Sequence, residues 1–190
     1  STLMLQLLEQ PGIRYLTNDR LFIRRDSGTV MAAGIPKLPR VNPGTIVHNA
    51  SLAGMIPAAE RTRLLALPPA ELWEIEDKYD VHVERVYGPG RIQPAAPLNA
   101  FLVLNWKRGD PEPPSLEPVD LTQRRDLLGA LMKSPGPFYQ YPDGSFHRDD
   151  AEFDESAYLR ALAGVTVWEA RGGIDFAVLE RLCLERILSD

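Results

Sequence analysis

The segment from Gly34 to Gly44 carries two cations on a chain that prolines make stiff. Lys37 and Arg40 stand three residues apart, and Asn42 adds an amide side chain that can hydrogen-bond. A stiff segment that presents cations and glycine amides loses little entropy when it captures an anion, as a phosphate site requires. The same composition suits a surface loop whose prolines only restrict the unfolded chain. The residue types leave both interpretations open.

A second candidate group is Asn18-Asp19, which follows the short segment from Arg14 to Thr17. This segment is typical of a β-strand, and an open α/β sheet binds ligands where its strands end. An aspartate there can hold a magnesium ion or accept a proton from an attacking hydroxyl. Asn-Asp-Arg is also a common turn composition. The position after a strand favours a functional role for Asp19.

Two hydroxyl residues, Ser1 and Thr2, precede the first apolar residues, which have the spacing of one helix face: Leu3, Met4, Leu7 and Leu8. We expect a helix that begins here, with both hydroxyls near the free amides of its first turn. A Ser/Thr helix leading to a strand that ends in an acid also follows the phosphate loop GxxxxGK[ST] of nucleotide-binding kinases. The glycines and lysine of that loop are absent. An ordinary capped helix is therefore the simpler interpretation.

Other titratable groups have sufficient structural explanations. Glu74 and Lys78, in ELWEIEDKYD, form an i,i+4 pair on an expected helix. The three histidines show no metal-binding spacing: His48, His82 and His147. Cys183 is the single cysteine, which excludes intrachain disulfides and a cysteine-rich zinc site.

Composition limits the classes of partner. The chain has 21 Lys and Arg against 26 Asp and Glu, a formal net charge of -5, so we expect no nucleic-acid partner. No apolar run is long enough to cross a bilayer, and no basic and apolar leader is present. These features predict a cytoplasmic protein that does not bind membranes. We expect a single domain over residues 1–190, as a C-terminal fragment of a longer chain.

Periodicity and turn residues predict the elements that position these groups. Strands are expected at 14–17, at 21–24 and 29–32 as a hairpin, at 81–87, at 101–104 as an inner strand, and at 165–168. Helices are expected from residue 1, at 57–67, 69–78, 120–132 and 155–162, and after residue 175. Loops are expected at 34–43, 108–118 and 138–150. This mixture favours an α/β fold with a partly antiparallel sheet and flanking helices.

Several segments together resemble the HPr-kinase-related proteins of bacteria, in particular the branch called HprK-related kinase B. They are the opening helix, YLTNDRLFI, GIPKLPRVNPGT, LWEIEDKYDV, the strand ending in LNW, and GGIDF. The resemblance covers nearly the whole chain. It implies a P-loop kinase fold similar to the core of phosphoenolpyruvate carboxykinase, and ATP-dependent phosphorylation of a protein serine. It also implies self-association, because HPr kinases assemble into rings.

The resemblance assigns the nucleotide and metal ligands. Ser1 looks like the hydroxyl residue that follows the phosphate-loop lysine, so that loop would lie upstream of the chain or be missing. Ser1 and Thr2 are then expected to bind Mg²⁺ and the phosphates of ATP. Asn18 and Asn42 are expected as further nucleotide ligands.

The resemblance also assigns the reacting groups. In HPr kinases the strand after this helix ends in two aspartates, a base for the seryl hydroxyl and a group near magnesium. Asn18 cannot take up a proton, so Asp19 alone is expected to serve as base and as magnesium ligand. Lys37 and Arg40 are expected to neutralise the transferring phosphoryl group. The Glu-x-Arg-Gly signature of true HPr kinases is absent, so the acceptor can be another protein or a small molecule.

Two further functions stay open. A kinase-like scaffold that has lost nucleotide use would be a non-catalytic interaction module, which the absent glycine-lysine segment and Asn18 favour. A carboxykinase-like enzyme acting on a small carboxylate would need a metal-binding His or Lys pair that the sequence does not show.

Overall fold

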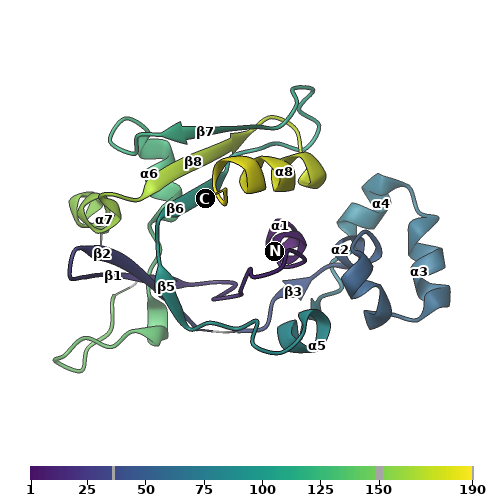
Figure 1. The fold of residues 1–190 in the computed structure, drawn as a ribbon, viewed down its shortest axis with the longest axis horizontal. Helices are drawn as coiled ribbons and strands as arrows, with labels where there is room; N and C mark the ends of the chain where they lie inside the picture. Colours follow the sequence, from purple (N-terminus) through teal and green to yellow (C-terminus); the bar gives the residue numbers. More distant parts are fainter. Residues whose placement is uncertain (36, 149–151, 190) are drawn as a thin grey trace. The chain divides into compact units, whose positions relative to one another are not determined.

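The computed structural model describes residues 1–35, 37–148 and 152–189, so the expected loop positions of Pro36 and Asp149-Asp150 lie outside the described residues. The described residues form a mixed α/β structure of small sheets with flanking helices, as the sequence predicts (Figure 1). Two compact units make up the chain: Ser1–Leu21 with Ala33–Ala96, and Phe22–Ala32 with Pro97–Asp190. Each unit has its own apolar core. The expectation of one domain over residues 1–190 stays a prediction.

The first unit is mainly helical. Its helices are α1 (Thr2–Leu7), α2 (Pro43–Val47), the 3₁₀ helix η1 (Ala50–Met55), α3 (Ala58–Leu65), α4 (Pro69–Glu74) and α5 (Val83–Tyr87). Two short strands, β3 (Arg40–Val41) and β4 (Tyr79–Asp80), pair antiparallel. The core takes side chains from most of these segments: Leu5, Leu8, Ile46, Leu52, Leu64, Leu72, Val81 and Val83.

The buried face of α1 differs from the predicted one. Leu3 and Leu5 are both buried, whereas Met4 is only half-buried. Residues two apart point about 200° apart around a helix, so α1 is covered on more than one side. The predicted single apolar face leaves Leu5 on the exposed side of the helix, but Leu5 is buried.

Three other predictions for the first unit are wrong. Residues 14–17 form no strand, only an isolated parallel bridge between Tyr15 and Ile92. The expected strand 81–87 contains helix α5, because Val83, Val86 and Tyr87 also fit helical spacing. Helix α4 ends at Glu74, since the residues just beyond it lead into the β4 pairing with β3. The i,i+4 pairing of Glu74 with residue 78 therefore has no helix to support it.

A three-stranded sheet has the order β1-β2-β5, with β1 (Leu21–Asp26), β2 (Thr29–Gly34) and β5 (Ala95–Pro97). Between β1 and β2, Ser27 and Gly28 have φ angles of 48° and 89°. Two consecutive positive φ angles are typical of the type I′ turn that closes a tight hairpin. The hairpin predicted around this turn is confirmed.

A second three-stranded sheet lies in the second unit. Its order is β6-β8-β7, with β6 (Ala100–Leu104) parallel to β8 (Thr166–Arg171) and β7 (Ser115–Val119) antiparallel to it. The partly antiparallel sheet is confirmed. The inner position of β6 is wrong: β8 is the central strand, and Leu104 on the edge strand β6 is 45% exposed. Strand β7 begins inside the expected loop 108–118 and accommodates Pro118 because it is also an edge strand.

The helices of the second unit are α6 (Arg125–Leu131), the 3₁₀ helix η2 (Gly136–Phe138), α7 (Glu155–Leu162) and α8 (Phe176–Arg186). Helices α6 and α7 contribute to the core of this unit, which is formed by Val103, Leu121, Leu127, Leu128, Leu162 and Val167. Helix α7 has the predicted bounds, and α8 lies beside β7 (Figure 1). Asp154 and Asp175 cap α7 and α8 with their side chains. In the described part of the chain, no helix has the length and apolar character that a membrane crossing requires.

Candidate functional site

Asp19 and Lys37, two of the predicted site residues, meet in the first unit. The Lys37 Nζ atom lies 3.7 Å from Asp19 Oδ2, and Arg20 Nη1 lies 3.1 Å from the same oxygen. The sequence analysis selected Asp19 and Lys37 for different reasons, and the fold brings them together. It missed Arg20, which had been assigned only to a turn.

The proline segment is fixed against the segment that carries Asp19. The Thr17 hydroxyl donates to the carbonyl of Ile35 at 3.0 Å. A Cβ atom on Gly34 would lie 2.5 Å from Thr17 Cβ and 2.7 Å from Leu16 Cδ2. Only glycine therefore allows the two backbones to come this close.

The first residues of α1 lie beside the same segment. The Ser1 hydroxyl donates to Asn18 Oδ1 at 2.9 Å, and the Thr2 and Thr45 hydroxyls are 2.7 Å apart. Neither contact is the predicted cap, because the N-cap residue Ser1 makes no side-chain hydrogen bond to the amides of α1. The hydroxyl of Ser1 reaches Asn18 instead, so two predicted nucleotide ligands are in contact.

The two remaining predicted residues, Arg40 and Asn42, have other surroundings. Arg40 Nε lies 3.4 Å from Asp80 Oδ1, its partner across the β3-β4 pair. Asn42 precedes α2 and does not cap it with its side chain. Its Oδ1 atom is buried and has no hydrogen-bond partner among the described residues. In the part of the chain that the structure describes, neither residue forms a hydrogen bond or ion pair with Asp19.

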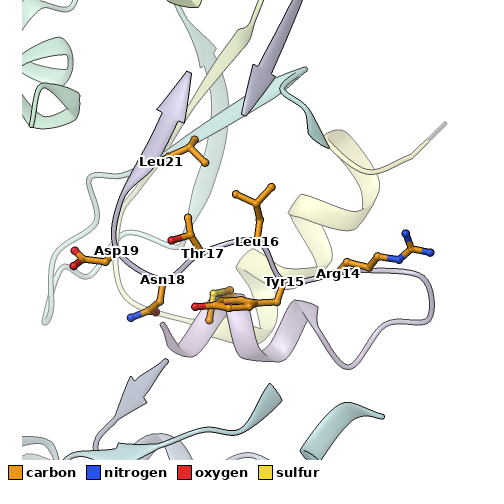
Figure 2. A pocket seen from close by; sticks show the side chains of 8 residues that line it. Arg14, Tyr15, Leu16, Thr17, Asn18, Asp19 and Leu21 are labelled. Atoms are coloured by element: carbon orange, nitrogen blue, oxygen red, sulfur yellow. The ribbon is translucent and has the colours of Figure 1, made fainter. Parts of the chain in front are cut away.

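A cavity of about 310 Å³ opens beside Asp19 (Figure 2). It is lined by Met4, Arg14, Tyr15, Leu16, Thr17, Asn18, Asp19 and Leu21. Figure 2 shows Asn18 and Asp19 at one end of the labelled segment and Arg14 at the other. The volume is at the lower limit of small-molecule sites and suits a small ligand or a single side chain. The sequence analysis missed Arg14 and Thr17, although both belong to the segment that leads to Asp19.

Among the described residues, three basic side chains lie at or beside this site: Arg14, Arg20 and Lys37. Lys37 and Arg20 both contact the single carboxylate of Asp19. Arg14, at the far end of the cavity, donates to the neutral Oε1 of Gln93 at 3.0 Å. Guanidinium and ammonium groups form strong hydrogen bonds with anions, so these basic side chains suit an anionic ligand.

The metal chemistry that the site allows follows from its oxygen donors. Ser1 and Asn18 bring a hydroxyl and an amide oxygen together at the residue that precedes Asp19. Mg²⁺ prefers such hard oxygen ligands, and it commonly needs only one or two carboxylates when phosphates supply the rest. Among the residues that the structure describes, no three His, Cys, Asp or Glu side chains form a potential metal site.

The second unit contains a buried charge cluster that the sequence analysis missed. Glu169, on β8, is 1% exposed. Its carboxylate accepts hydrogen bonds from Arg124 Nη1 at 2.5 Å, Arg171 Nε at 2.6 Å and Asn105 Nδ2 at 2.6 Å. Burial alone would raise the pKa of Glu169, but these hydrogen bonds lower it to about 2. The signal in the sequence is an acid inside an apolar strand.

Comparison with known proteins adds no family assignment. No family model matches the chain, and no match was found among curated proteins or solved structures. Function is therefore inferred from the residues and contacts of the first unit.

Proposed function

We propose that this protein is an ATP-dependent phosphotransferase of the HPr-kinase-related type. It transfers the γ-phosphoryl group to a hydroxyl, and a protein serine is the acceptor that the resemblance favours. The observation that carries the proposal is the contact of Asp19 with Lys37 beside a small cavity that Asp19 and Arg14 line. A base for the acceptor and a cation for the phosphoryl group are needed at one place, and these two residues meet that need.

In this proposal the oxygen of the acceptor hydroxyl attacks the γ-phosphorus, and Asp19 accepts the proton of that hydroxyl. The new oxygen–phosphorus bond forms while the bond to the β-phosphate oxygen breaks, and ADP leaves. Lys37 stabilises the charge that spreads over the phosphoryl oxygens, and Arg20, which contacts Asp19 Oδ2 at 3.1 Å, orients the Asp19 carboxylate. Such catalysis consists chiefly of positioning and electrostatic stabilisation. Arg40 contributes only if its pair with Asp80 opens.

Mg²⁺ would be held by the Asp19 carboxylate and the Ser1 hydroxyl, together with phosphate oxygens. The ion would neutralise charge on the nucleotide phosphates. The contact of Ser1 with Asn18 supports this arrangement because it holds the hydroxyl next to the residue that precedes Asp19. The P-loop fold in the proposal requires the sequence GxxxxGK directly before Ser1 in the gene.

The test is transfer from labelled ATP with Mg²⁺ to a bacterial lysate by the full-length protein. Asp19→Asn should lower transfer at least about 100-fold, because the base is lost, and should change ATP affinity by less than about threefold. Asp26→Asn is the matched control, since Asp26 is also an exposed aspartate paired with an arginine. An intact phosphate loop without ATP affinity, or full activity of Asp19→Asn, would overturn the proposal.

A non-catalytic interaction module is the second candidate. It is favoured by Asn18, which stands where HPr kinases have an acid and whose side-chain oxygen is taken by Ser1. The module predicts that the wild-type protein neither binds ATP nor transfers phosphate, and still captures one defined protein. The same labelled-ATP experiment therefore separates the two functions.

A further inference from the structure

Tyr15 connects the cavity segment to the backbone of Lys37. The ring of Tyr15 is buried, with 2% of the residue exposed, and its hydroxyl donates to the carbonyl oxygen of Lys37. The backbone of Tyr15 is itself fixed, because its amide donates to Arg91 O at 2.7 Å and its carbonyl accepts from Gln93 N at 2.8 Å. Tyr15 is therefore a rigid donor aimed at one peptide group of the proline segment.

One short segment thus holds Lys37 at both ends. The Tyr15 hydroxyl binds its carbonyl, and the Asp19 carboxylate lies 3.7 Å from its ammonium group. Thr17, between these two residues, donates to the carbonyl of Ile35 at 3.0 Å. The Lys37 amide donates to that same Ile35 carbonyl at 2.7 Å.

We propose that Tyr15 is a positioning residue that keeps the Lys37 ammonium group against Asp19. This inference rests on the proposed function, because it assigns Tyr15 a role in the transfer step. A free lysine side chain samples many rotamers, and the entropy of ordering it opposes its use as a fixed cation. Fixing its backbone on the segment that carries Asp19 removes part of that cost before substrate binds.

The chain provides a matched control for a merely structural tyrosine. Tyr87, in the same unit, also donates its hydroxyl to a backbone carbonyl, that of Leu5, at 3.1 Å. Burial raises the pKa of both tyrosines to about 12, so both hydroxyls stay protonated donors. Tyr87→Phe removes the same chemical group without touching Lys37. A purely structural role predicts equal behaviour of the two Phe variants.

The first experiment needs no nucleotide. Trypsin cleaves after Lys37, and the Tyr15 hydroxyl binds the carbonyl of that peptide bond. In the full-length protein, Tyr15→Phe should speed cleavage between Lys37 and Leu38 about fivefold, as expected for loss of one hydrogen bond. Tyr87→Phe should change it less than twofold. Equal rates in the wild type and Tyr15→Phe, or equal acceleration by both variants, would overturn the inference.

The second experiment measures phosphoryl transfer. Tyr15→Phe should lower kcat about tenfold and leave KM for ATP unchanged, whereas Tyr87→Phe should leave both unchanged. Two results together would refute the proposed function but support the contact of Tyr15 with Lys37: faster trypsin cleavage of Tyr15→Phe, and no phosphoryl transfer by the wild type. Transfer by the wild type with an unchanged kcat in Tyr15→Phe would refute only the positioning role. If Tyr15→Phe does not fold, Thr17→Val replaces it, because it removes the neighbouring hydroxyl anchor.

Discussion

The positions of Asp19 and Lys37 at the candidate site give them their importance. Their ion pair contributes little to the stability of the fold. Their side chains are 50% and 58% exposed, so water and salt screen the attraction between them. Exposed ion pairs contribute about 0–1 kcal/mol to the free energy of unfolding. So weak a contact adds little to the stability of the fold, and a ligand anion can displace Asp19 from Lys37 with only a small loss of free energy. This balance suits groups that exchange partners during a reaction.

Glu169 shows the opposite balance. Glu169→Gln should lower the free energy of unfolding by about 3–5 kcal/mol at neutral pH, because Arg171 loses its carboxylate partner and Arg124 keeps only Asp126. The measurement is urea unfolding. The control is Glu117→Gln, since Glu117 forms an exposed pair with Arg186 and should change stability by less than about 1 kcal/mol. Equal effects of the two substitutions would show that the buried cluster contributes no more than a surface pair.

At the scale of the elements, the close approach of two segments determines the site. Gly34→Ala would put a methyl group 2.5 Å from Thr17 Cβ and 2.7 Å from Leu16 Cδ2, so the segments must separate. We expect a loss of about 1–3 kcal/mol in the free energy of unfolding and faster trypsin cleavage after Lys37.

Gly54→Ala is the matched control for this prediction. Apart from its chain neighbours and nearby helix backbone, no described atom lies within 4 Å of a Cβ built on Gly54, so this substitution adds no tertiary contact. It should change stability by less than about 0.5 kcal/mol and leave cleavage after Lys37 unaffected. Similar effects of the two alanines would contradict the close approach of the segments.

The sequence could predict the elements whose signals are local. The turn at Ser27 and Gly28 and the cap at Asp154 act within a few residues, and the hairpin and α7 were predicted correctly. Elements that depend on a distant partner were not: α4 is shorter because β4 pairs with β3, and residues 14–17 form only a bridge to Ile92. Periodicity carries no information on such partners.

The candidate site divides in the same way. Residue types and order were enough to select Asp19 and Lys37, because acids after a strand-like segment and cations in a stiff loop suggest chemistry on their own. Residue types could not show that Arg40 pairs with Asp80, since that contact depends on the β3-β4 pairing. Nor could they show the role of Tyr15, whose hydroxyl bond to residue 37 is a tertiary contact.

At the scale of the whole molecule, the candidate site and the Glu169 cluster belong to different units, each with its own apolar core. The first unit contains Asp19, Lys37 and the contact between them, and the second contains the Glu169 cluster. Loss of the Glu169 cluster should therefore weaken the core of the second unit without removing any contact of Asp19 or Lys37.

Low pH should remove the stabilisation that Glu169 gives to the second unit. The pKa of Glu169 falls from 4.5 to about 2 on folding, so its stabilisation is complete above pH 4.5 and is lost as the pH falls towards 2. The loss should amount to about 3 kcal/mol, the free-energy equivalent of this pKa difference. Because Glu169→Gln cannot titrate, the stability difference between the wild type and this variant should narrow by that amount. Urea unfolding at pH 7, 4.5, 3 and 2, with hydrogen exchange of the β8 amides, measures this change. A stability difference that stays constant with pH would mean that folding does not change the pKa of Glu169.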